Sequence, residues 1–199
     1  MRSSRPRDNN IHCFRCYMRR ETCICPILPI VQTRTEFLIL RHIRETERPS
    51  NTGRLAALAM PNARIIPCGG GDRTGLAPLD DTFLRMTNTW LLWPDGDGAQ
   101  PDLPLPERIV VLDATWQQAR RLYSRTPELQ AMPRLLLPFP DKSRKRLRDP
   151  HRADGMSTIE AVAAAVAVLE GKKVAEPLEK LYDEVVRRTI SLRWGIKLS

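Results

Sequence analysis

Residues 108–116 read Arg-Ile-Val-Val-Leu-Asp-Ala-Thr-Trp, and this stretch decides the fold class. Residues 108–112 form a short apolar run without alternation, which is typical of a strand covered on both faces of a parallel sheet. Asp113 ends the strand, and a helix is predicted to begin near Thr115. A strand that passes directly into a helix is the repeating unit of α/β proteins.

The same alternation of short apolar strands and helical segments continues in both directions. Strands are predicted at 36–41, 63–67, 89–93 and 134–137, and helices at 53–59, 79–86, 157–169 and 176–192. We therefore expect an α/β fold whose mainly parallel sheet is flanked by helices. In such sheets ligands bind beyond the carboxyl ends of the strands.

The charge balance is basic, with 32 Lys and Arg against 23 Asp and Glu among 199 residues, a net charge of +9. Residues 1–25 hold six basic and two acidic residues, and residues 141–152 hold the same numbers, so each region carries +4. Two such patches suit RNA better than a membrane surface. No apolar run reaches the roughly 20 residues that a bilayer span needs. We expect a cytoplasmic protein, with a monomer favoured.

Four of the five cysteines lie within a short N-terminal stretch, as Cys13, Cys16, Cys23 and Cys25, spaced C-x2-C-x6-C-x-C. Four thiolates at such short range suit tetrahedral zinc, and a closed set of four sulfur ligands makes the site structural. An iron–sulfur cluster and four unligated thiols remain the alternatives. The chain then divides into a basic tail with a metal knuckle at 1–30 and an α/β domain at 31–199.

Basic side chains at two places are candidate RNA contacts. In the knuckle they stand beside Phe14 and Tyr17, a mixture that suits phosphates and unstacked bases, although a solvated surface explains them nearly as well. The candidate RNA-binding residues are Arg15, Arg19, Arg20, Lys142, Arg144, Lys145, Arg146 and Arg148.

Three segments carry candidate chemistry at expected strand ends or helix starts. The cluster Ser50-Asn51-Thr52-Gly53 precedes a helix, where backbone N–H groups can bind an anion. Asp113 suits a general base or a ligand for an ammonium or hydroxyl group, and a simple cap is the alternative. Ser157 and Glu160 match a capping box, which explains them without any ligand, yet such a helix start can also hold one.

Together these stretches resemble the DTW-domain family, the tRNA-uridine aminocarboxypropyltransferases. The resemblance is carried, in the family's order, by the four cysteines and by residues 48–54 (RPSNTGR), 91–94 (LLWP), 113–116 (DATW) and 156–161 (MSTIEA). The family more usually has Leu in place of Met156. Residues 146–148 match only part of the pattern expected before that motif.

The resemblance implies a fold related to the knotted SPOUT-type enzymes and S-adenosylmethionine as the donor. The implied reaction transfers the 3-amino-3-carboxypropyl group to N3 of a tRNA uridine and releases methylthioadenosine. Ribosomal RNA remains open as an acceptor. The alternatives are a SPOUT-like RNA methyltransferase and a zinc-knuckle RNA-binding protein without catalysis.

The resemblance also suggests roles for individual residues. Asp113 is the expected base for the uridine imide proton, and Arg44 or Arg54 is expected to bind the carboxylate of the donor. For Trp116 we favour a place in the core over stacking on a base. The other expected donor-binding residues are Ser50, Asn51, Thr52, Gly53, Leu92, Trp93, Pro94, Thr115, Trp116, Ser157, Thr158 and Glu160.

Overall fold

A computed structural model of the chain describes residues 8, 10–69, 79, 82–94, 105–141, 143–147 and 155–194. At its centre five strands pair in the order β2-β1-β4-β3-β5, and every pairing is parallel. The strands are β1 (Glu36–His42), β2 (Ala63–Cys68), β3 (Thr89–Leu92), β4 (Arg108–Asp113) and β5 (Arg134–Leu135). The expected α/β class with a parallel sheet is confirmed.

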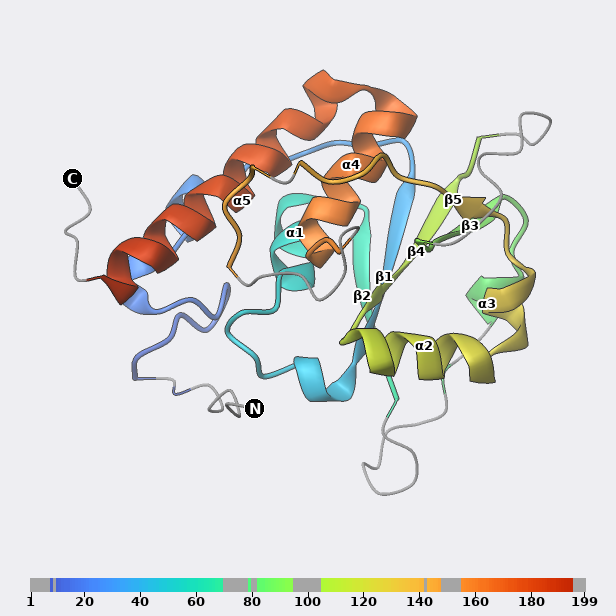
Figure 1. The fold of residues 1–199 in the computed structure, drawn as a ribbon, viewed down its shortest axis with the longest axis horizontal. Helices are drawn as coiled ribbons and strands as arrows, with labels where there is room; N and C mark the ends of the chain where they lie inside the picture. The colour runs from blue at the N-terminus through green and yellow to red at the C-terminus, as the bar shows by residue number, and fades with distance from the viewer. Residues whose placement is uncertain are drawn as a thin grey trace.

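Helices cover both faces of the sheet (Figure 1). The helices are α1 (Gly53–Ala59), α2 (Trp116–Arg125), α3 (Pro127–Ala131), α4 (Thr158–Glu170) and α5 (Lys172–Arg193). Phe37 and Ile39 of β1 pack in one apolar cluster with residues of α1, α4 and α5. Leu38 and Leu40 belong to a second cluster, with Ala119 of α2. Because successive side chains of a strand point to opposite faces, a strand of consecutive apolar residues serves both clusters.

Several elements differ from the expected bounds. Helix α3 was not expected, because five residues are too few to show a helical period. Helix α5 begins at Lys172, before the expected start at 176, and Pro177 lies inside it. Within the expected helix at 79–86 the structure has a 3-10 helix at Thr82–Arg85. Strand β5 ends at Leu135 and does not reach 137.

The cysteine segment packs against the body of the protein. Two short 3-10 helices, Arg20–Thr22 and Cys25–Ile27, shape it. Cys16 and Ile24 are buried in the same apolar cluster as residues of α5. Arg188 of α5 donates a hydrogen bond to the backbone oxygen of Cys23. In the part of the chain that the structure describes, no helix combines the length and apolar character needed to cross a bilayer.

Candidate functional site

A cavity of about 590 Å³ lies where β3 and β4 end and α2 and α4 begin. This volume is within the range of small-molecule and cofactor sites. Residues 136–141 and 143–147, here called the crossing segment, run from β5 across α4 towards α5 (Figure 1) and supply part of the wall. The cavity therefore lies beyond the carboxyl ends of the strands, where parallel sheets usually bind their ligands.

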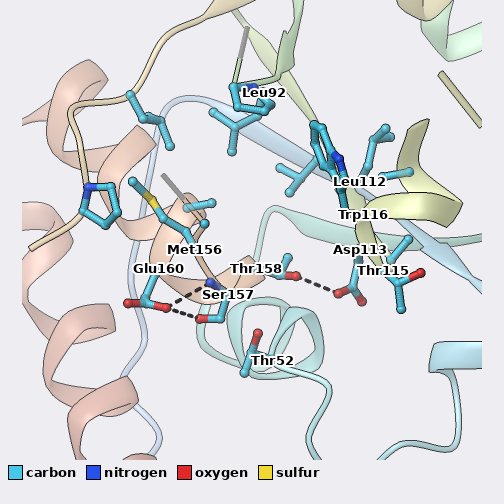
Figure 2. Close-up of a pocket in the computed structure, with 18 of the residues that line it drawn as sticks. Thr52, Leu92, Leu112, Asp113, Thr115, Trp116, Met156, Ser157, Thr158 and Glu160 are labelled. Carbon is cyan, nitrogen blue, oxygen red and sulfur yellow. Dashed lines mark hydrogen bonds between the residues drawn. The ribbon is translucent and has the colours of Figure 1, made fainter. Parts of the chain in front are cut away.

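The cavity brings together most of the residues singled out from the sequence, although they come from separate segments (Figure 2). Arg44, Gly53 and Arg54 are not among the residues that line it. The expected residues that do line it are Ser50, Asn51, Thr52, Leu92, Trp93, Pro94, Asp113, Thr115, Trp116, Ser157, Thr158 and Glu160.

Asp113 is the polar centre of this arrangement. Its side chain is 5% exposed, and its two oxygens face different elements. Thr158 of α4 donates its hydroxyl to Oδ1 at 2.7 Å (Figure 2). Asn51, just before α1, donates its amide to Oδ2 at 2.6 Å. One carboxylate at the end of β4 thus holds the starts of two helices in place.

The cation that balances Asp113 is Arg41, which was not singled out from the sequence. The two residues are register partners on the neighbouring strands β1 and β4. Arg41 Nε lies 3.5 Å from Asp113 Oδ2, and the arginine side chain is 5% exposed. Burial lowers the pKa of Arg41, and the negative charge of Asp113 acts against that shift. The feature of the sequence that could have identified Arg41 is its position as an arginine at the end of an apolar strand, where a buried cation needs an acidic partner.

Gly53 does not line the cavity but touches its central carboxylate. A Cβ at this position would lie 2.5 Å from Oδ2 and 2.6 Å from Cγ of Asp113. Gly53→Ala is therefore expected to lower the free energy of unfolding by about 1–3 kcal/mol, because a well-packed site must shift. Urea denaturation measures this effect. The loss should shrink in an Asp113→Ala background, which removes the clashing atoms; an equal loss in both backgrounds would contradict the proposed clash.

Both helix starts at the cavity are closed by capping boxes. Thr115 accepts from the backbone N–H of Gln118, whose side chain accepts from the backbone N–H of Thr115. Ser157 forms the same reciprocal pair with Glu160 at the start of α4. Both predicted helix starts are therefore capped, and the capping residues Thr115, Ser157 and Glu160 also line the cavity.

Trp116 packs against the second apolar cluster, the place that we favoured for it. It is half-buried and lines the cavity, and its ring stacks on Trp93 with centroids 5.2 Å apart. Trp93 stacks in turn on Tyr123 at 4.5 Å. Two rings of this stack, Trp93 and Trp116, therefore form part of the cavity wall.

The four clustered cysteines have the geometry of a metal site. Their sulfur atoms all lie within 4.8 Å of one another. The Sγ atoms of Cys13 and Cys25 are 3.7 Å apart, as are those of Cys16 and Cys23. A tetrahedron with zinc–sulfur bonds of about 2.3 Å has edges of about 3.8 Å, so the donor set fits zinc.

Crowding of the thiols gives a physical reason for a cation at this place. Burial raises the pKa of Cys25, and hydrogen bonding to the neighbouring cysteines adds to the shift. Burial acts in the same direction on Cys13, but hydrogen bonds from the backbone of Cys16 and Arg15 and from the side chains of Cys23 and Cys25 together outweigh it and lower the pKa to about 6. Four thiolates cannot share so small a space without a positive charge between them.

Metal analysis tests the knuckle. Purified protein is expected to contain about one zinc ion per chain, and Cys16→Ser is expected to lose most of it, since a tetrahedral site then lacks one of its four ligands. Cys68→Ser is the matched control, because Cys68 is a buried cysteine outside the cluster. Wild-type protein without zinc or iron would contradict the metal site.

The expected RNA-binding residues divide into two groups. Arg15, Arg19 and Arg20 are exposed on the knuckle, and Phe14 in the same segment is 80% exposed. Lys145 is also exposed.

Two arginines of the crossing segment instead pair with helices of the body. Arg144 Nε donates to Asp183 of α5 at 2.8 Å, and Arg146 Nε donates to Glu160 of α4 at 3.0 Å. Lys142 and Arg148 lie outside the described residues.

Comparisons with known proteins give a consistent pattern. The family model described as "DTW domain" matches residues 10–190. A "tRNA-uridine aminocarboxypropyltransferase 2" from Macaca fascicularis is 25% identical over 174 residues, 83% of this chain and 58% of the relative. The protein of the same name from Drosophila melanogaster is 26% identical over 183 residues, 85% of this chain and 71% of the relative.

A plant protein extends the pattern. "tRNA-uridine aminocarboxypropyltransferase A" from Arabidopsis thaliana is 26% identical over 129 residues, 55% of this chain and 49% of the relative. The chain spans 58% of the length of the macaque relative and 56% of that of the mouse relative. No solved structure matches the chain significantly.

Proposed function

The chain belongs to the DTW domain family, and on that premise we propose that it transfers the 3-amino-3-carboxypropyl group of S-adenosylmethionine to N3 of a uridine in tRNA. The observation that carries the proposal is the meeting of the segments 50–52, 92–94, 113–116 and 157–160 around one cavity. The names of the relatives support the aminocarboxypropyl group and the tRNA uridine, and the donor and the N3 position follow from the family resemblance.

The lining of the cavity fits the donor. Leu92, Leu112 and Trp116 offer apolar and aromatic contact for an adenosine, and hydroxyl groups of Ser157 and Thr158 lie at the start of α4. When bound, S-adenosylmethionine supplies a sulfonium that activates the adjacent carbons and leaves as the thioether of methylthioadenosine. The residues of the chain then have one main task, to fix which carbon faces the nucleophile.

Asp113 is our candidate for the group that takes the proton from uridine N3. It lines the cavity, and a carboxylate has about four acceptor positions, so the bonds from Asn51 and Thr158 leave room for a proton. The deprotonated nitrogen then bonds to the γ-carbon of the donor while the carbon–sulfur bond breaks. Asn51, Thr158 and Arg41 hold the carboxylate at a fixed place for this transfer.

The exposed knuckle arginines are our candidates for binding tRNA, together with Lys145. Arg15 and Arg19 are exposed in the same short segment as the exposed ring of Phe14, a combination that suits contact with phosphates and an unstacked base. We also propose zinc as the structural ion of the knuckle, a knotted SPOUT-like arrangement, a monomer and a cytoplasmic location. The five parallel strands with helices on both faces are compatible with the SPOUT-like fold.

Nucleoside analysis tests the proposal. Unmodified tRNA is incubated with the protein and S-adenosylmethionine, digested to nucleosides and analysed by mass spectrometry. We expect a uridine that has gained an aminocarboxypropyl group. A methylated nucleoside would favour an RNA methyltransferase, and unchanged nucleosides with tight, salt-sensitive RNA binding would favour a non-catalytic RNA-binding protein; either result contradicts the proposal.

A further inference from the structure

One arginine stands out in the cavity. Among the described residues that line it, Arg146 is the only lysine or arginine. The two arginines expected to bind the carboxylate of the donor lie elsewhere. Arg44 is exposed, and Arg54 places its guanidinium 3.2 Å from the ring centroid of Tyr17 and donates to the backbone oxygen of Thr46.

Arg146 is held firmly before any ligand arrives. Its side chain is 10% exposed and its partner Glu160 is 5% exposed. Arg146 Nε donates to Glu160 Oε1 at 3.0 Å, and Nη2 donates to the backbone oxygen of Asp141 at 2.8 Å. The other oxygen of Glu160 accepts from the N–H and the hydroxyl of Ser157. The guanidinium is therefore fixed to the cap of α4, and a fixed group loses little entropy when it binds.

The Arg146 guanidinium retains binding capacity. It carries five N–H donors, and within the part of the chain that the structure describes its bonds to Glu160 and Asp141 use one donor at Nε and one at Nη2. Arg146 lines the cavity, so a carboxylate inside it can form a charge-assisted pair with the remaining donors. Glu160 already offsets the positive charge of Arg146. A ligand that carries an α-ammonium group beside its carboxylate brings the second positive charge that the site then needs.

We propose that Arg146 binds the carboxylate of the aminocarboxypropyl group, and this inference rests on the proposed function. Glu160 and Asp113 lie on opposite sides of Thr158 in Figure 2, so the Arg146–Glu160 pair and the proposed base occupy different ends of the polar wall. A donor held by its carboxylate at one end presents its γ-carbon towards the other. Arg146 thereby selects aminocarboxypropyl transfer over methyl transfer, by orientation alone.

Binding measurements on the full chain test this role. Titration calorimetry compares S-adenosylmethionine, its decarboxylated analogue and methylthioadenosine, which lacks the whole aminocarboxypropyl group. Wild-type protein is expected to prefer S-adenosylmethionine over the decarboxylated analogue. Arg146→Gln is expected to weaken S-adenosylmethionine binding about 10- to 100-fold, the usual size for a lost charge-assisted hydrogen bond, and to leave methylthioadenosine binding within about twofold.

Two further variants keep the test decisive. Arg146→Lys keeps the positive charge and should recover part of the lost affinity for S-adenosylmethionine. If Arg146→Gln does not fold, Arg146→Lys replaces it in the comparison with wild type. Arg144→Gln is the matched control, because Arg144 anchors the same crossing segment to Asp183 and does not line the cavity.

Each outcome has a definite meaning. A similar loss for all three ligands, shared by Arg144→Gln, would assign Arg146 to holding the segment and overturn the inference. A preference for S-adenosylmethionine that survives Arg146→Gln would also overturn it. Wild-type protein that binds neither S-adenosylmethionine nor methylthioadenosine would instead refute the proposed function, whatever Arg146 does.

Discussion

Asp113→Asn is expected to slow aminocarboxypropyl transfer to tRNA about 10²- to 10⁴-fold, the usual contribution of a general base. An amide keeps the size of the carboxylate but cannot take the proton from uridine N3. The rate is measured in a single turnover at saturating S-adenosylmethionine, so that a change in donor affinity does not enter. Product is counted as modified nucleoside.

Two controls separate this effect from damage to the fold. Glu176→Gln changes an exposed carboxylate on α5 that pairs with Lys180 one turn away, and it should leave the rate within about twofold of wild type, since surface substitutions rarely matter. Thr158→Val removes the hydroxyl that donates to Oδ1 but keeps the carboxylate, so it should retain far more activity than Asp113→Asn. Asp113→Asn with more than a tenth of the wild-type rate would remove Asp113 as the base.

The buried ion pair gives the largest expected effect on stability. Arg41→Met leaves the carboxylate of Asp113 buried at the centre of the site without its cation. Breaking a buried pair by removing one partner costs about 3–5 kcal/mol. We therefore expect the free energy of unfolding, measured by urea denaturation, to fall by that amount.

A surface pair on the next strand is the matched control. Arg64 of β2 pairs with Glu36 at 2.7 Å, but its side chain is 61% exposed. Arg64→Met should cost about 0–1 kcal/mol, as exposed ion pairs do. The double variant Arg41→Met with Asp113→Asn should recover part of the loss, because the neutral amide no longer buries a lone charge. Equal losses for Arg41→Met and Arg64→Met would contradict the account of the buried pair.

Much of the fold and site could be predicted from the sequence, because the features that mark strands, helix starts and caps lie within a few neighbouring residues. The apolar run that ends at Asp113 predicts a strand, the polar cluster 50–53 predicts a helix start, and Ser157 with Glu160 predicts a cap. Parallel topology then places strand ends and helix starts at one edge of the sheet. This is why segments far apart in the chain meet at one cavity.

The position of Arg146 has no local signal. Residues 141–152 read as a basic patch open to solvent, yet the crossing segment turns back over α4 and pairs Arg146 with Glu160. Arg41 shows the same limit, because its partner is set by the register between β1 and β4. Conversely, Arg54 lies in a polar motif but stacks on Tyr17 of the knuckle, a contact between segments that spacing does not encode.

The central claim is that the γ-carbon of the donor, and not its methyl carbon, is transferred to RNA. Two samples of S-adenosylmethionine test it, one labelled in the methyl group and one in the carboxyl group, each incubated with the protein and bulk tRNA. The account predicts that tRNA acquires the carboxyl label and none of the methyl label. Methyl label in the tRNA, without carboxyl label, would contradict it.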